Sequence, residues 1–232
     1  MRLGELEEIR DLDLFKTMAE KNFSDMMNAA YLQTFPSQVE LIREGDPADF
    51  FYVVIEGCVE LFAKSNDRET TMAMVRPVGT FILAAVLKDA IYLMSARTCD
   101  RSKIVMIPSQ DVRSAVNKDQ EFAGSIINEL AGCYRAVVKE QKNLKLRTTV
   151  ERLANRLIKF HAEQGGNNTI ELPYDKKTLA ALLGMTPENL SRGFNTLKPY
   201  GVTVKGNYID ILDFESLAAL AKPNQLIDDR VI

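Results

Sequence analysis

The sequence is poor in the side chains that most catalytic and metal sites need. It has one histidine, His161, three cysteines and no tryptophan among 232 residues. Histidine-based triads and histidine-rich metal sites need imidazole beside specific partners, so enzymes of these kinds are disfavoured. The cysteines, Cys58, Cys99 and Cys133, match no zinc or iron–sulfur spacing and leave one thiol over if two are paired. A reducing environment is expected.

Long apolar runs are also missing. No apolar stretch approaches the roughly 20 residues that a membrane-spanning helix needs. The start of the chain, from Met1 to Glu8, is acidic, whereas a secretory signal would be basic and then apolar. We therefore expect a cytoplasmic protein that makes no membrane contact.

Excess charge is small overall but unevenly placed. The chain has 29 basic and 32 acidic residues, for a net charge of −3. Residues 145–210 carry 10 basic and 6 acidic side chains, whereas the segments on both sides are acidic. A basic stretch favours a polyanionic partner for that stretch, although a solvated charged face gives the same pattern. The length fits one or two domains.

Turn residues divide the segment from about Phe35 to Pro108 into short β-strands. The expected strands are residues 39–42, 50–55, 59–62, 70–75 and 103–107, with Gly and Asp in the turns between them. The polar stretch from Lys64 to Glu69 is expected to form a hairpin tip. Short strands at near-regular spacing are typical of a compact antiparallel roll or barrel. We expect this roll, with short N-terminal helices, to occupy residues 1–108.

A helical pattern follows from Ser109 to about Leu144. Apolar residues recur at alternating spacings of three and four, which is typical of a helix that pairs with another helix. The seam expected at a dimer interface is Ile126, Leu130, Cys133, Val137 and Leu144. The alternative is that the stripe packs on the protein's own roll. Residues 109–147 are therefore interpreted as a dimerisation helix and hinge.

The last region has the pattern of a winged helix-turn-helix. A helix from about Thr148 to Gln164 ends at Gly165-Gly166, and His161 is expected to be a helix-surface or domain-packing residue on it. A second helix covers 176–183, and Gly184-Met185 connects it to a third that begins at Thr186 and Pro187, a good N-cap and first helical residue. Residues 202–211 alternate around Gly206-Asn207, as in a hairpin wing. The domain is expected at 148–222, with a polar tail at 223–232.

The third helix carries the candidate base-reading residues. Glu188, Ser191 and Arg192 project from one side of it, and in a major groove Arg bonds guanine, Glu accepts from cytosine and Ser contacts bases or phosphates. The alternative is a solvated helix face. Residues placed to touch the phosphate backbone lie on the neighbouring segments. The complete predicted DNA-binding set is Lys176, Lys177, Thr178, Thr186, Glu188, Asn189, Ser191, Arg192 and Lys198.

The order of roll, long helix and winged helix-turn-helix resembles the cyclic AMP receptor protein and fumarate-nitrate regulator (CRP/FNR) superfamily of bacterial transcription regulators. The resemblance rests on Leu41–Ala48, Val53–Val59 and Leu182–Arg192, and it spans about residues 20–212. It implies an α+β fold with a jelly roll like a cyclic nucleotide-binding domain, a homodimer that binds double-stranded DNA, and RNA polymerase as a partner. Glu188, Ser191 and Arg192 resemble the fumarate-nitrate type, which implies TTGAT-like palindromic half-sites.

The sequence departs from the family where an effector would bind. Relatives that bind cyclic AMP have a Gly-Glu pair and an Arg-Ser pair, but Leu83 and Ala84 replace the first and Met94 replaces the Arg, while Ser95 remains. Burying a phosphate without a paired cation is costly, so we predict that cyclic AMP does not bind in the usual way. An iron–sulfur cluster is also disfavoured because no cysteine precedes Cys58.

An apolar segment remains as the candidate effector pocket, or as ordinary core. Its residues are Phe81, Ile82, Leu83, Ala84, Tyr92, Leu93, Met94 and Ser95. One hypothesis is haem or another apolar effector, as in the nitric-oxide-responsive relatives that lack both other sensors. Its conceivable iron ligands are Met72, Met74, Tyr92, Met94, Cys58 and Cys99. The other hypothesis is a regulator without an effector, because methionine and aromatic stripes are more often core.

Two other classes of function compete with a regulator. A cupin-like metalloenzyme needs clustered His and carboxylate ligands on its strands, and no histidine precedes His161, so we expect no enzymatic activity. An interaction module whose helix-turn-helix contacts protein would show no salt-dependent DNA binding. The metal content, the effector and the sign of regulation are left open by the sequence.

Overall fold

The structure, a computed structural model, describes residues 3–66 and 68–229 of the chain. The chain folds into two compact units, residues 1–133 and 134–232, each with its own apolar core. The expected α+β fold is confirmed: an antiparallel roll comes first, then a long helix, then a winged helix-turn-helix. No helix in these described ranges is long and apolar enough to span a membrane.

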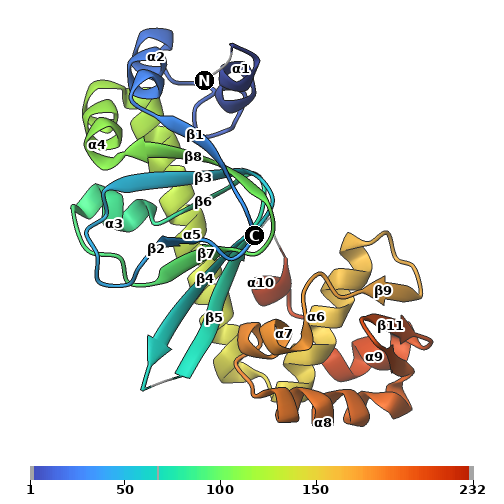
Figure 1. Ribbon diagram of the computed structural model, residues 1–232. Helices are drawn as coiled ribbons and strands as arrows, with labels where there is room; N and C mark the ends of the chain where they lie inside the picture. The colour runs from blue at the N-terminus through green and yellow to red at the C-terminus, as the bar shows by residue number, and fades with distance from the viewer. Residues whose placement is uncertain (1–2, 67, 230–232) are drawn as a thin grey trace. The chain divides into compact units, whose positions relative to one another are not determined.

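Two antiparallel sheets of four strands form the roll in the first unit (Figure 1). One sheet has the order β1-β8-β3-β6, with β1 (Tyr31–Phe35), β8 (Ser102–Pro108), β3 (Phe50–Glu56) and β6 (Gly79–Phe81). The other has the order β2-β7-β4-β5, with β2 (Glu40–Ile42), β7 (Ser95–Thr98), β4 (Val59–Ser65) and β5 (Arg68–Val75). β3 and β8 are rich in aromatic and β-branched residues and lie in the middle of their sheet, where most of their side chains are buried.

The hairpin between β4 and β5 is tighter than the sequence predicted. The two strands pair as far as Ser65 and Arg68, so Lys64 and Glu69 belong to the ladder and not to a polar tip. The expected tip is therefore too long at both ends, and residue 67 lies outside the described residues. Cross-strand pairing of Lys64 with Glu69 explains the difference, because opposite charges on facing residues support the ladder.

Helices cover the roll and complete its core. The N-terminal helices α1 (Leu3–Arg10) and α2 (Glu20–Asn28) are joined by a segment that carries Phe15, which is completely buried. The Phe15 ring stacks on Phe122 at a centroid distance of 5.9 Å and tilts against Phe23 at 6.0 Å. Aromatic pairs of this geometry stabilise a core beyond the contribution of the apolar area that they bury. The segment before the first strand thus packs against the start of the long helix.

The helix predicted from Ser109 to Leu144 is two helices, α4 (Ser109–Lys118) and α5 (Gln120–Leu146). Asp119, between them, adopts an extended conformation with φ −124° and ψ 107°. Its carboxylate accepts hydrogen bonds from the N–H of Phe122 at 3.0 Å, the N–H of Ala19 at 2.8 Å and the amide of Asn22 at 2.8 Å. Asp119 is therefore the N-cap of α5 and ties it to α2, which explains the break.

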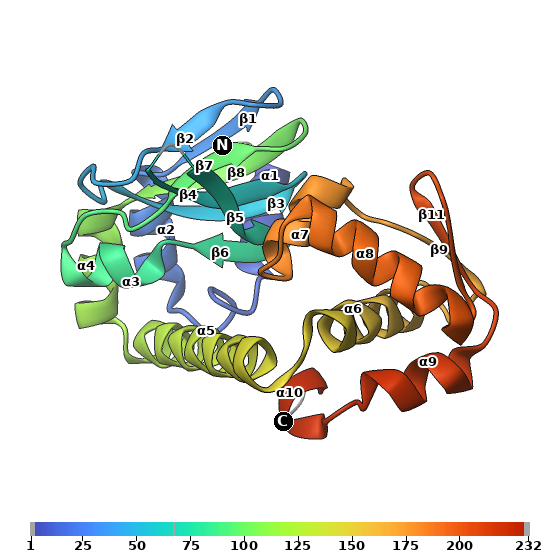
Figure 2. The same cartoon turned by 90° about the horizontal axis from the view of Figure 1, so that it is seen from below.

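The second unit is built around α6 (Thr149–Glu163), with α8 and α9 packed along it (Figure 2). Thr148 and Glu151 form a capping box at its start, and Gly165 and Gly166, both at positive φ, end it as expected. His161 packs against Phe214, with ring centroids 4.7 Å apart, which confirms it as a packing residue. The remaining elements are β9 (Thr169–Glu171), α7 (Lys176–Leu182), α8 (Pro187–Leu197), the 3-10 helix η1 (Lys198–Tyr200), β10 (Val202–Lys205), β11 (Tyr208–Ile211), α9 (Phe214–Ala221) and α10 (Gln225–Asp228).

The predicted wing hairpin is present and has a third strand. β10 and β11 pair around Gly206-Asn207, and Gly206 has φ 63°, as the turn requires. β9 pairs with β11, and Asn207 fixes the connection because its amide donates to the carbonyl of Leu172 at 2.9 Å. β9 was not expected from the sequence because a strand of only three residues gives no clear alternation.

The C-terminal tail is not merely a polar extension. Within residues 223–229 it forms the short helix α10, and Asp228 makes a bidentate ion pair with Arg147, including a 2.8 Å bond between Nη1 and Oδ1. The Arg147 side chain is only 7% exposed in this pair. The tail therefore closes over the connection between α5 and α6, and residues 230–232 lie outside the described residues.

Candidate nucleic-acid interface and effector segment

The turn between α7 and α8 is tight and capped at both ends. Gly184 has φ 61°, and a Cβ there would come within 2.8 Å of Leu144. The Thr186 hydroxyl accepts from the N–H of Asn189 at 3.3 Å, and Pro187 occupies the first helical turn. These observations confirm the predicted N-cap and helix start, and they fix the direction in which α8 leaves the turn.

The apolar residues expected to lock the two helices are buried in the core of the second unit. They are Leu179, Ala180, Leu183, Leu190 and Phe194, with Met185 packed partly against them. Gly193 faces α6, where a Cβ would lie 3.0 Å from Leu153, so its lack of a side chain lets α8 approach closely. One face of α8 is therefore fixed against α6, and the other faces solvent.

The predicted DNA-contacting residues lie on the solvent side. Thr178 is half-buried, and all the others are exposed: Lys176, Lys177, Thr186, Glu188, Asn189, Ser191, Arg192 and Lys198. Glu188, Asn189, Ser191 and Arg192 all belong to α8, whereas Lys176, Lys177 and Thr178 are in the first turn of α7. Within the described ranges, no ion pair engages Lys176, Lys177 or Lys198, so these cations are available to a polyanion.

Glu188 is held in its charged form. Its pKa is lowered by a backbone N–H at the start of α8, by the Thr186 hydroxyl and by the positive charge of Arg192. A carboxylate at a helix N-terminus is favoured for the same reason. Glu188 can therefore accept hydrogen bonds from a base edge, while Arg192, one turn later, can donate them.

A buried arginine, which the sequence reasoning missed, positions the turn. Arg152 of α6 is 8% exposed and donates to the carbonyls of Leu183 at 2.9 Å, Gly184 at 3.5 Å and Arg147 at 2.9 Å. Burial lowers the pKa of Arg152, with the charge of Glu140 opposing this. Arg152 supplies donors to carbonyls at the end of α7 that the helix itself leaves free. The signal in the sequence was a charge among Leu153, Ala154 and Leu157.

Asn155, the next buried polar residue of α6, supplies donors to a carbonyl at the end of α9. Its amide donates to the carbonyl of Ala221 at 2.6 Å and to that of Glu151 at 2.8 Å. Ala221 is the last residue of α9. One helix thus orients the ends of two others through buried side chains, and the position of α8 depends on this arrangement.

The apolar stripe of α5 differs from the predicted seam. Ile126 is 2% exposed because it packs with Phe122 in the core of the roll, so it is not available to a partner. Leu130 is half-buried against the same core, whereas Cys133, Val137 and Leu144 are exposed as a seam requires. The exposed large apolar residues of α5 are Ile127 at 64%, Tyr134 at 71%, Val137 at 59%, Val138 at 40%, Leu144 at 43% and Leu146 at 69%. The exposed stripe therefore begins at Ile127 and not at Ile126, because Phe122 and Ile126 face the core of the roll.

The candidate effector segment is mainly core. Phe81, Leu83 and Tyr92 are buried, Ile82 and Met94 pack partly against the same core, and Ala84 is exposed. Leu93 is 76% exposed, so the prediction that it belongs to an apolar pocket or plug is wrong. The Ser95 hydroxyl accepts from the N–H of Glu44 at 2.9 Å. Ile82 has φ 68°, which β-branched residues rarely adopt, at the start of α3 (Leu83–Lys88).

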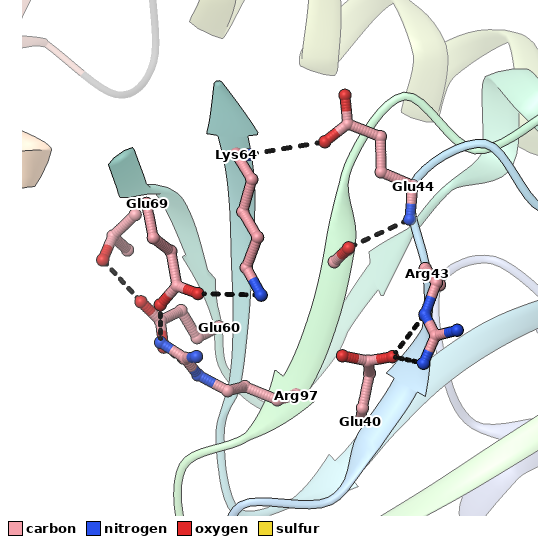
Figure 3. Close-up of polar contacts among 9 residues, drawn as sticks. Glu40, Arg43, Glu44, Glu60, Lys64, Glu69 and Arg97 are labelled. Carbon is pink, nitrogen blue, oxygen red and sulfur yellow. Dashed lines mark hydrogen bonds and ion pairs between the residues drawn. The ribbon is translucent and has the colours of Figure 1, made fainter. Parts of the chain in front are cut away.

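Arg97 and Lys64, two cations of the neighbouring sheet, are already paired. Figure 3 shows Arg97 of β7 bound to Glu60 and Glu69, each at 2.8 Å, and Lys64 bound to Glu69 at 3.3 Å. The guanidinium of Arg97 also lies 4.3 Å from the centre of the Phe62 ring. The pKa of Glu69 is lowered mainly by its hydrogen bond from Arg97. This network therefore offers no free cation to a cyclic phosphate.

The conceivable haem ligands do not all face one site. Tyr92 and Met94 face the core, and the Tyr92 hydroxyl bonds the backbone of Phe50, whereas Met72 is 54% exposed on β5. Cys58 and Cys99 flank the β4–β7 ladder. Within residues 3–66 and 68–229, no three His, Cys, Asp or Glu side chains gather as metal ligands.

Comparisons with known proteins match both units. Residues 32–119 match the cyclic nucleotide-binding domain, and residues 151–220 match the Crp-like helix-turn-helix domain. A CRP-like cAMP-activated global transcriptional regulator of Mycobacterium tuberculosis is 23% identical over 194 residues, which cover 81% of this chain and 87% of the relative.

Solved structures show the same fold. FixK2 from Bradyrhizobium japonicum has a TM-score of 0.70 at 21% identity and covers 84% of this chain and 98% of its own. DNR from Pseudomonas aeruginosa has a TM-score of 0.51 at 22% identity and covers 95% of this chain and 98% of its own. At these identities the likeness concerns the fold alone, so neither structure assigns an effector.

Proposed function

The chain belongs to the CRP/FNR family of transcription regulators, and we propose that it is a homodimer that binds palindromic DNA through α8. We propose further that an effector other than cyclic AMP controls this binding. The observation that carries this proposal is the division of α8. Leu190, Gly193 and Phe194 are buried against α6, while Glu188, Ser191 and Arg192 are exposed on the opposite side. A recognition helix needs this combination of a fixed face and a free polar face.

Each exposed residue has a role in the proposal. The Arg192 guanidinium donates two hydrogen bonds to guanine, and Glu188 accepts one from cytosine. Ser191 and Asn189 make the remaining contacts in the major groove. The phosphate contacts come from the remaining members of the set, which are Lys176, Lys177, Thr178, Thr186 and Lys198. Since Glu188, Ser191 and Arg192 resemble the fumarate-nitrate type, the proposed half-sites are TTGAT-like.

The second copy is proposed to lie along α5. Ile127, Leu130, Tyr134, Val137 and Leu144 follow the alternating spacing of three and four that pairs two helices, interrupted only at Gln141. All but the half-buried Leu130 are substantially exposed in a single chain. Pairing along α5 would place two copies of α8 in grooves one turn apart, roughly 34 Å. In this proposal residues 1–108 hold the sensor, 109–147 the dimer helix and hinge, 148–222 the DNA-binding domain and 223–232 the tail.

The residues present do not fit cyclic AMP in the usual way. Leu83 and Met94 pack on the core, and the Ser95 hydroxyl is engaged by the backbone of Glu44. Arg97 is bound to two carboxylates. A phosphate would therefore have to displace existing pairs without a replacement for the lost charge.

Haem fits no better, because Tyr92, Met94 and Met72 do not converge, and Cys58 and Cys99 face each other across a strand ladder. Tyr92 and Met94 lie between α3 and β7 and face inward, whereas Met72 faces outward on β5. We therefore assign no step to haem, and the nitric-oxide-responsive branch stays a prediction. Protein expressed with haem supplied and then reconstituted would contradict this assignment if it showed a Soret absorption band.

A regulator of this kind would work in the bacterial cytoplasm, where the genome and RNA polymerase are. RNA polymerase is the proposed protein partner after DNA binding. The polar residues of the proposed DNA interface belong to α7, α8 and the segment after α8, an arrangement suited to binding DNA. We propose no catalytic activity for it.

The test is binding to a duplex with two inverted TTGAT half-sites whose centres lie one helical turn apart. The expected result is tight, salt-dependent binding that weakens at least tenfold when the half-sites are scrambled or moved apart by half a turn. Added cyclic AMP should leave the affinity unchanged. Equal binding to all three duplexes would contradict the DNA-reading proposal, and a tenfold response to cyclic AMP would contradict the effector proposal.

A further inference from the structure

Two cysteines far apart in the sequence lie side by side in the roll. Cys58 directly precedes β4, and Cys99 directly follows β7. These strands pair antiparallel with Val59 opposite Thr98, so the next position of the ladder places Cys58 opposite Cys99. The N–H of Cys99 donates to the carbonyl of Cys58 at 2.9 Å, which confirms this placement.

The spacing of such a pair suits a disulfide. Facing residues in an antiparallel ladder have Cα atoms about 4.5–5.5 Å apart, within the 4.4–6.8 Å or so that a disulfide accepts. Both cysteines are free, and the backbone bond between them holds their two positions side by side. Cys58 is buried, whereas Cys99 is partly exposed, so a small oxidant can reach the pair from the side of Cys99. No backbone rearrangement is therefore needed to join the two sulfurs.

The turn before β4 holds Cys58 in place. The Ser102 hydroxyl accepts from the N–H of Cys58 at 3.1 Å, and it also lies 3.2 Å from the carbonyl of the same residue. Gly57 has φ 87°, and a Cβ there would come within 2.7 Å of the Arg101 carbonyl oxygen. The backbone of Cys58 is thus fixed from two directions.

The surroundings favour one thiolate in the pair. The pKa of Cys58 is lowered because the Cys99 thiol donates to its thiolate and Arg76 adds positive charge, while burial, Asp100 and Glu60 oppose the shift. The same shared proton raises the pKa of Cys99. The pair therefore ionises once more readily than twice, which leaves one nucleophile and one thiol in contact.

We propose that Cys58 and Cys99 form a redox site that a hydroperoxide, with hydrogen peroxide as the simplest member, converts to an intrachain disulfide. The thiolate of the pair attacks one peroxide oxygen, the O–O bond breaks, and the leaving hydroxide takes a proton to become water. The sulfenic acid formed is then attacked by the second sulfur, and a second water leaves with the proton of that thiol. Two thiols are oxidised to one disulfide, and the peroxide is reduced to two waters.

The test uses the full-length reduced protein and hydrogen peroxide in slight excess. The expected result is a fall from three free thiols per chain to one, a mass loss of two hydrogens, and a single crosslinked peptide pair containing Cys58 and Cys99. The chain should keep its monomeric mobility on a denaturing gel without reductant. The unfolding midpoint should rise by several degrees, because the link closes a long loop, and a dithiol reductant should restore all thiols.

Variants provide the matched controls. Cys133→Ser should keep the crosslink and fall from two free thiols to none, since Cys133 is exposed on α5 and outside the pair. Cys99→Ser should form no intrachain disulfide, because the second sulfur of the pair is missing. An unchanged thiol count under these conditions, or a crosslink through Cys133 only, would overturn the proposal. None of these readouts involves DNA, so the result is independent of the proposed function.

Discussion

The two units use charge in opposite ways. In the roll, Arg97 is bound to Glu60 and Glu69, and the segment where relatives hold a cyclic phosphate is packed with Leu83, Tyr92 and Met94. In the second unit, cations at the start of α7 and after α8 lie on the surface outside the ion pairs of the described chain. Arg97 in the roll thus holds strands together, whereas the lysines at the start of α7 and after α8 remain exposed.

Buried polar groups show a second contrast. In the winged helix, Arg152 and Asn155 reach from α6 to the ends of α7 and α9. In the roll, Asp119 and Ser102 bind backbone groups at turns and helix starts. Helices leave carbonyls free at their ends, and the connections in the roll leave N–H groups free, so each unit places the matching donor or acceptor there.

The largest loss of stability is expected from a substitution at Gly57, a glycine of the roll. Gly57 and Gly45 have similar positive φ values, 87° and 92°, but a Cβ at Gly57 meets backbone atoms and a Cβ at Gly45 meets nothing within 4 Å. Gly57→Ala should therefore cost about 4 kcal/mol of unfolding free energy, and Gly45→Ala about 1 kcal/mol. Denaturant unfolding measures both, and equal losses would show that backbone strain alone decides the cost.

The next effect concerns the buried arginine. Arg152→Ala should lower the free energy of unfolding by about 3 kcal/mol, because buried carbonyls lose charged donors. Arg156→Ala, on the same helix, is the control and should cost less than about 0.5 kcal/mol, since its contact is a distant one with the Phe160 ring at 6.0 Å. Similar unfolding midpoints for the two variants would remove the positioning role assigned to Arg152.

Arg192→Ala should change DNA binding and leave stability unchanged. The expected loss of binding free energy on the TTGAT duplex is about 1–3 kcal/mol, with relaxed preference at one base pair. The free energy of unfolding should move by less than about 0.5 kcal/mol, because Arg192 is exposed. Competition binding against duplexes with single base changes measures the preference, and an equal loss on every duplex would contradict the base-reading role.

Arg97→Ala should lower stability and leave DNA binding unchanged. It leaves Glu60 and Glu69 without their shared cation, so the free energy of unfolding should fall by about 1–2 kcal/mol, while DNA affinity stays the same. Arg43→Ala removes the exposed pair with Glu40, whose side chains are 73% and 41% exposed, and should cost about 0.5 kcal/mol at most. If the two variants were equally stable, the network would be no stronger than a surface pair.

The smallest effect is expected at a phosphate contact. Lys177→Ala should weaken binding to cognate and scrambled DNA alike, by less than about 1 kcal/mol, because a phosphate contact carries no sequence information. The slope of log affinity against log salt should fall by about 1. Titrations at several salt concentrations measure the slope, and an unchanged value would place Lys177 outside the interface.

Local signals identified much of the interface. Thr186, Pro187, Gly184 and Gly206 occupy the cap and turn positions that the sequence predicted, because these residue types have narrow conformational preferences. The resemblance of residues 182–192 to a known family added the roles. Arg152 was missed because an arginine on a helix normally points to solvent, and only the nearby end of α7 makes it a buried donor.

The helix break and the seam required tertiary information. Asp119 precedes Gln120 and Glu121, a usable N-cap signal, but its extended backbone depends on bonds from Ala19 and Asn22 a hundred residues away in sequence. The shift of the seam from Ile126 to Ile127 depends on Phe122 meeting Phe15. Periodicity gives the spacing of a stripe but not which side the core takes.

The sequence by itself determined the order of the domains and the caps and turns of the winged helix-turn-helix. These depend on residue type and on neighbours along the chain. Only the tertiary structure brought Cys58 to Cys99, Arg97 to Glu60 and Glu69, and Arg152 to the end of α7. Such contacts arise from strand register and helix packing, which bring together residues whose separation in sequence carries no signal.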